Sequence, residues 1–88
     1  MKIKSDFILR DMGDMRIVVA VGESAKSFNG VINLNETAEF MWKKLSAGCT
    51  REELIESILA EYDVPAEVVE KDVDNLLEKL KKENILDE

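Results

Sequence analysis

The chain offers few side chains that could build a catalytic centre. It has no histidine and a single cysteine, Cys49, so that thiol has no imidazole to activate it. Cys49 lies beside an expected helix start, which can lower a thiol pKa, but an inert residue in a turn is the simpler interpretation. The four glycines are scattered and form no phosphate-binding loop. The sequence therefore predicts no catalytic residue.

The carboxylates, although abundant, suggest no metal site. Most of the 19 aspartates and glutamates fall on the polar faces of expected helices, where solvation explains them. Asp72 and Asp74 stand close together but lack the spaced oxygen ligands of a calcium loop. A lone cysteine cannot supply a multi-cysteine metal site or an internal disulfide. We expect neither a metal nor a cofactor.

The length and charge limit the class of protein. Eighty-eight residues suit one small domain that spans residues 1–88. The net charge of −7 disfavours nucleic acid as the main partner, because an acidic domain repels phosphate backbones. The first ten residues are too charged for a signal peptide, and no segment approaches the roughly 20 apolar residues that cross a bilayer. We expect a cytoplasmic protein without a membrane partner.

The first third of the chain predicts three short strands. Phe7–Leu9 is an apolar run, and Arg16–Val21 is dense in β-branched residues that favour a strand. The polar segment Glu23–Ser27 is expected to be a loop. Asn29-Gly30 is a strong turn dipeptide, and Val31–Leu34 follows it as the third strand.

The remainder predicts three amphipathic helices. Asn35 suits the N-cap of the first helix, and Gly48 suits its end. Thr50 and Glu53 form a capping box that opens the second, and Pro65 suits the first turn of the third. The apolar stripes of the three helices comprise Ala38, Met41, Trp42 and Leu45; Leu54, Ile55, Ile58, Leu59 and Tyr62; and Val69, Val73, Leu76, Leu77 and Leu80.

This element order predicts an α+β fold, in which a three-stranded antiparallel sheet precedes a three-helix bundle. Trp42 lies on the first stripe and is expected in the core. Phe40 lies off that stripe, so we expect it to be exposed or to contact a partner. Ile85-Leu86 forms an apolar stub near the end of the chain.

Binding is the function that the pattern leaves open. A three-stranded sheet has two edges with unpaired backbone groups, and an extended peptide can join such an edge as a new strand. Val31–Leu34 is a candidate edge because it is short, apolar and directly before the first helix. The pattern alone does not decide between a peptide-binding edge and one protected by solvent and loops.

The stretch Phe28–Trp42 resembles the signature of the pyrroloquinoline quinone biosynthesis protein D family, a strand ending in Leu-Asn before a helix with a tryptophan. Gly is common in the family where this chain has Ala38. Further similar segments, in order over nearly the whole chain, are Phe7-x-Leu9-Arg10, Val21-Gly22-Glu23, Thr50-x-Glu52-Glu53-Leu54, Glu61-Tyr62-Asp63-Val64, Asp72-Val73 and Ile85-Leu86.

The resemblance implies a winged-helix-like domain that recognises ribosomally made, post-translationally modified peptides. Such domains hold the leader of a precursor peptide along the third strand and beside the third helix. They present it to a modifying enzyme, often a radical S-adenosylmethionine (SAM) protein. Many family members serve pathways other than quinone synthesis, so the resemblance implies leader recognition without fixing the pathway.

The resulting site hypothesis combines the third strand with one flank of the third helix. A 3.6-residue period places Asp72, Asn75 and Lys79 on one side of the helical stripe and Glu70, Asp74 and Lys81 on the other. Asp72 belongs to the family-like pair Asp72-Val73, so the resemblance favours the first flank. The alternative is that the polar residues of this flank are simply solvated and that Leu76 is a core residue. The predicted peptide-binding residues are Val31, Ile32, Asn33, Leu34, Asp72, Asn75, Leu76 and Lys79.

Two alternatives remain at this stage. One is a winged-helix nucleic-acid binder, although such proteins usually carry a basic helix and the third helix here mixes lysines with many acids. The other is a structural or dimerisation module, and a homodimer is left open.

Overall fold

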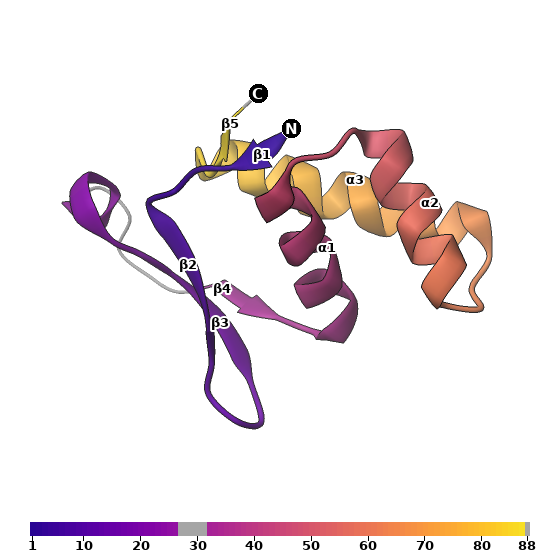
Figure 1. The fold of residues 1–88 in the computed structure, drawn as a ribbon, viewed down its shortest axis with the longest axis horizontal. Helices are drawn as coiled ribbons and strands as arrows, with labels where there is room; N and C mark the ends of the chain where they lie inside the picture. The colour runs from indigo at the N-terminus through magenta and orange to yellow at the C-terminus, as the bar shows by residue number, and fades with distance from the viewer. Residues whose placement is uncertain (27–31, 88) are drawn as a thin grey trace.

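A computed structural model of the chain describes residues 1–26 and 32–87. A small sheet and a larger sheet lie beside three helices (Figure 1). The elements in chain order are β1 Lys2–Ile3, β2 Phe7–Asp11, β3 Arg16–Ala20, the 3-10 helix η1 Gly22–Lys26, β4 Ile32–Leu34, α1 Glu36–Ala47, α2 Arg51–Glu61, α3 Ala66–Lys82 and β5 Leu86–Asp87. The predicted α+β architecture is confirmed.

The larger sheet has the order β2-β3-β4, with antiparallel neighbours. A tight turn joins β2 to β3, and Gly13 in this turn has a φ of 93°, a conformation that glycine adopts without strain. The Gly13 amide donates to the Asp11 carboxylate at 2.9 Å. The turn therefore places the first two predicted strands side by side as an antiparallel pair.

The structure places Gly22–Lys26 in a 3-10 helix, where the sequence predicted a loop over Glu23–Ser27. Such short 3-10 helices are common connectors and leave little periodicity to detect. The predicted turn at Asn29-Gly30 and the first residue of the predicted third strand, Val31, lie outside the described residues.

The small sheet was not predicted. β5 pairs antiparallel with β1, with Ile3 opposite Leu86. The Lys4 amide also donates to the Ile85 carbonyl at 2.9 Å. The apolar stub at the end of the chain is therefore a strand that ties the two ends of the chain together (Figure 1). Two-residue strands carry no readable alternation, which explains the omission.

The residues predicted to begin and end the helices do so, except that one of them lies one position earlier than predicted. The Asn35 side chain accepts a hydrogen bond from the Ala38 amide at 2.8 Å, and Gly48 ends α1 with a φ of 95°. Thr50 and Glu53 form the reciprocal capping box of α2. Pro65 is the N-cap of α3 and so precedes the first turn that the sequence assigned to it.

The core lies where the sheets and the three helices meet. Its buried apolar residues are Ile3, Phe7, Val18, Ile32, Leu34, Met41, Trp42, Leu45, Leu54, Ile58, Val69, Val73, Leu76, Leu77, Leu80, Ile85 and Leu86. The expectation that Trp42 belongs to the core is confirmed. No helix in the described residues is long and apolar enough to span a membrane.

Two side chains depart from their predicted environments. Leu59, assigned to the stripe of α2, is 38% exposed, because it lies at the edge of that stripe. Phe40 is partly buried against the core. Its ring meets the Tyr62 ring edge-on, with 5.6 Å between centroids, so a contact from α1 to the end of α2 removes Phe40 from full exposure.

Candidate functional site

β4 forms one edge of the larger sheet. It pairs with β3 on one side, and no described strand pairs with its other side. The direction of its backbone groups follows from the ladder of β2 and β3. The Met12 amide donates to the Met15 carbonyl and the Val21 amide to the Asp6 carbonyl, which fixes the hydrogen-bonded pairs at both ends of that ladder.

Hydrogen-bonded and non-hydrogen-bonded pairs alternate along an antiparallel ladder. Ile17 and Val19 therefore direct their backbone groups to β2, whereas Val18 directs its own to β4. Val18 lies opposite Ile32, so Ile32 bonds to β3. By the same alternation Asn33 directs its amide N–H and carbonyl to the free edge. Asn33 is thus the described residue of β4 that offers the full pair of backbone groups to an additional strand.

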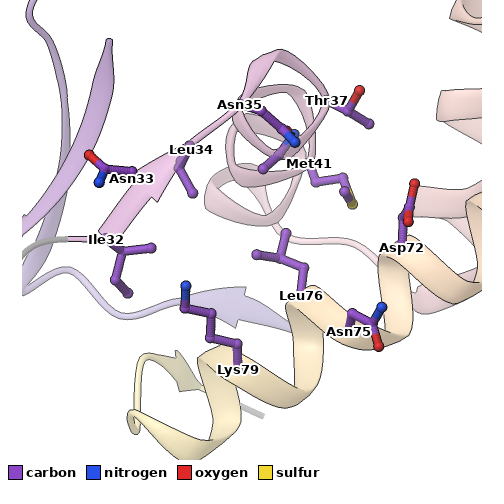
Figure 2. A pocket seen from close by; sticks show the side chains of 11 residues that line it. Ile32, Asn33, Leu34, Asn35, Thr37, Met41, Asp72, Asn75, Leu76 and Lys79 are labelled. Atoms are coloured by element: carbon purple, nitrogen blue, oxygen red, sulfur yellow. The ribbon is translucent and has the colours of Figure 1, made fainter.

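A groove of about 300 Å³ opens beside this edge, between β4, the first turns of α1 and one flank of α3 (Figure 2). We call it the β4–α3 groove. Its lining residues are Ile32, Asn33, Leu34, Asn35, Thr37, Ala38, Met41, Asp72, Asn75, Leu76 and Lys79. The side chains of Leu34, Met41 and Leu76 give it an apolar floor, and all three are buried.

The structure brings together the predicted site residues that it describes. Ile32, Asn33 and Leu34 line the groove from β4, and the four predicted α3 residues line it from the opposite wall. The Asn33 side chain is exposed and points away from the groove in Figure 2, so its contribution is its backbone. The remaining predicted residue, Val31, lies outside the described residues.

The opposite flank of α3 faces α2. The Asp74 carboxylate accepts two hydrogen bonds from the Arg51 guanidinium, at 2.7 and 3.0 Å. This pair turns Asp74 away from β4. The structure thus separates the two flanks that the sequence period distinguished, and it directs the flank of Asp72, Asn75 and Lys79 to the groove.

Sequence reasoning did not assign the α1 side of the groove. Asn35 was interpreted as a helix cap, Ala38 and Met41 as core residues, and Thr37 received no role. Their position directly after β4 is the signal that could have identified them, because a helix that starts at the end of an edge strand must flank that edge. Asn35, Thr37, Ala38 and Met41 all line the groove.

The Arg51–Asp74 pair predicts a measurable titration. The hydrogen bond from Arg51 lowers the pKa of Asp74 below its ordinary value. A carboxylate whose pKa is lower in the folded state stabilises the fold above its unfolded pKa, and that contribution disappears as the pH falls through the folded pKa. NMR titration should find a lowered Asp74 pKa that Arg51→Gln raises. An unchanged pKa in Arg51→Gln would show that the pair is absent in solution.

Cys49 has a structural environment and not a catalytic one. It is partly buried against the core, and its amide donates to the Met1 carbonyl at 3.0 Å. Burial, followed by the nearby Glu53 carboxylate, raises the thiol pKa. The helix start beside Cys49 therefore does not bring this pKa below its ordinary value, in keeping with the interpretation of Cys49 as an inert residue in a turn. No group of three or more potential metal ligands occurs among the described residues.

The raised pKa predicts that the Cys49 thiol reacts slowly with alkylating reagents. Because the thiolate is the reactive form, iodoacetamide should alkylate Cys49 more slowly in the folded protein at pH 8 than in the chain unfolded by urea. Mass spectrometry of the two time courses measures the ratio. Faster alkylation of the folded protein would identify an activated cysteine and overturn this assignment.

Two solved structures are similar to this chain. One solved structure, described as TbiB1 in complex with the TbiA(beta) leader peptide, is 24% identical with a TM-score of 0.79. The match covers 99% of this chain and 95% of that one. A second, lasso peptide synthetase B1 complexed with the leader peptide, is 18% identical with a TM-score of 0.76, over 96% and 93% of the two chains. Both share the fold.

A search of curated proteins found no match. A family model does match, and it is that of coenzyme PQQ synthesis protein D, over residues 16–86. This range contains β3, β4 and all three helices, and so every described element that lines the groove. The chain therefore belongs to the coenzyme PQQ synthesis protein D (PqqD) family.

Proposed function

We propose that this protein binds the leader of a ribosomally made precursor peptide as an additional strand on β4. The observation that carries the proposal is the free edge of β4 opening directly onto the β4–α3 groove. The edge supplies backbone hydrogen bonds, which are insensitive to sequence, and the groove supplies side-chain contacts, which select the sequence. Both are needed for specific recognition of an extended peptide.

The family and the two similar solved structures support this proposal. Each of those structures is described as a complex with a leader peptide. Their similarity to this chain extends over almost its full length and so includes the strand edge and the third helix. The leader is therefore the occupant that best fits the groove.

The protein acts as a recognition partner and a separate enzyme performs the modification. The two ionisable residues of the groove, Asp72 and Lys79, are seven residues apart on α3, about 10 Å along the helix axis. Among the described residues the two side chains form no ion pair with each other, so the groove holds no coupled acid and base. We assign the modification to a radical SAM protein or another peptide-modifying enzyme.

The two alternative functions have less support. A nucleic-acid binder needs a cationic surface, but among the described residues a single lysine lines the groove, and the chain carries a charge of −7. A dimerisation module would pair two β4 edges. Gel-shift titration with duplex DNA at low salt tests the first alternative, and light scattering over a concentration series tests the second.

The proposed function is tested by titration with a defined peptide. Leader segments of the short peptides encoded in the gene neighbourhood are labelled with a fluorophore and titrated, and one of them should bind saturably in fluorescence anisotropy. A scrambled peptide of the same composition serves as the control. Equal binding of the scrambled peptide, or no binding of the leader by folded protein, would contradict leader recognition.

A further inference from the structure

The charges of the β4–α3 groove are few and opposite. Asp72 and Lys79 are the ionisable residues among those that line it. Both are exposed, and among the described residues neither forms an ion pair. They are thus available to a ligand. Residues seven apart on a helix lie on the same side, two turns from each other.

The two charges mark opposite ends of the groove. In Figure 2, Asp72 lies on the side of Thr37, near the start of α1, and Lys79 extends toward Ile32, at the start of β4. The buried side chain of Leu76 lies between them. The groove therefore has a negative end on the side of Leu34, an apolar middle and a positive end on the side of Ile32.

We infer that Asp72 and Lys79 select the charge order and the direction of the bound leader. The inference rests on the proposed function. The described strand pairs of this fold are all antiparallel, and a leader that runs antiparallel to β4 in the same way enters at the Asp72 end and leaves at the Lys79 end. It should carry a basic side chain first and an acidic side chain later in the bound segment, on the same face of the strand.

Strand geometry sets the spacing of these two leader residues. Side chains on one face of a strand recur every second residue, at about 6.8 Å. The separation of about 10 Å between the two α3 positions then corresponds to two or four residues, and the long lysine side chain reaches either. The required leader pattern is a basic residue followed two or four positions later by an acidic one.

The test uses two peptides of identical composition. Both derive from the leader that binds in the anisotropy titration, one with the basic residue before the acidic residue in the bound segment and one with the two exchanged. Wild-type protein should bind the basic-first peptide about tenfold more tightly. That peptide makes two attractions with Asp72 and Lys79, whereas the exchanged peptide makes two repulsions, and all of these charges are exposed. High salt should reduce this preference, because the charges are exposed.

A charge exchange in the protein makes the test decisive. The double variant Asp72→Lys/Lys79→Asp keeps the composition and net charge and should prefer the acidic-first peptide. The control Lys71→Glu/Glu78→Lys exchanges charges with the same spacing on α3, but neither residue lines the groove, so it should keep the wild-type preference.

The outcomes separate the inference from the proposed function. If wild-type protein binds both isomers equally, or if the exchange of Asp72 and Lys79 does not invert the preference, the charge selection is wrong while leader binding stands. If folded wild-type protein binds neither isomer nor the natural leader, the proposed function fails as well.

Discussion

Asn33→Pro should abolish detectable leader binding, whereas Asn33→Ala should bind nearly as well as wild type. The ladder parity directs the Asn33 amide to the free edge, so proline removes the N–H that a leader carbonyl needs and places its ring in the same space. The leader carbonyl then stays unsatisfied, at a cost of about 1–3 kcal/mol before steric exclusion is added. Anisotropy titration measures the loss.

Two control variants complete this experiment, one with alanine at Asn33 and one with proline at the neighbouring Ile32. Asn33→Ala removes the same side chain but keeps the N–H, and that side chain points away from the groove (Figure 2). Ile32→Pro instead removes a bond to β3 and should destabilise the sheet, which circular dichroism would detect. Undiminished leader affinity in a folded Asn33→Pro variant would contradict strand addition at this edge.

Ile58→Ala should lower the free energy of unfolding by about 2–5 kcal/mol. Ile58 is 1% exposed in the core between the helices, so the substitution leaves a cavity that the surrounding side chains fill only in part. The loss is a large fraction of the roughly 5–15 kcal/mol that stabilises a typical domain. Urea denaturation, followed by the fluorescence of the buried Trp42, gives the difference.

The adjacent residue supplies a matched control. Leu59 is 38% exposed in the same helix, so Leu59→Ala should cost less than about 1 kcal/mol. Both substitutions place alanine one residue apart in α2, and helix propensity therefore contributes little to the difference between them. Equal destabilisation by the two variants would show that α2 packs on a different face.

Local chemistry made the helices and their ends predictable from the sequence. Asn35 and Thr50 each have an oxygen at the right place to accept an amide hydrogen bond, and no distant contact is needed to recognise this. The same holds for the long stripe of α3, where Val73 and Leu80 are both fully buried. Such signals repeat within a few residues and so survive in a single sequence.

Features that depend on contacts between residues far apart in the sequence were not predicted. β1 exists because β5 lies against it, although the two strands are at opposite ends of the chain. Phe40 is shielded because Tyr62 meets its ring from another helix. Leu59 followed the helical period but lies at the margin of the contact. In each case the deciding information is a tertiary neighbour, which periodicity does not encode.

The site was predictable in outline but not in its backbone detail. The period of α3 separated Asp72 and Lys79 from Asp74, and the structure places the two groups on different sides of the helix. The choice between these flanks came from resemblance rather than from pattern. The outward direction of the Asn33 backbone depends on the register of three strands, which the sequence alone does not fix.

Amide hydrogen exchange at Asn33, followed residue by residue by NMR with and without saturating leader, tests the central claim most directly. The account predicts that leader binding slows exchange at Asn33, because its N–H gains a strand partner, while Ile32 and Leu34 change less because their amides already bond to β3. If the leader saturates the protein and exchange at Asn33 stays as fast as in the free protein, the leader does not add a strand at β4.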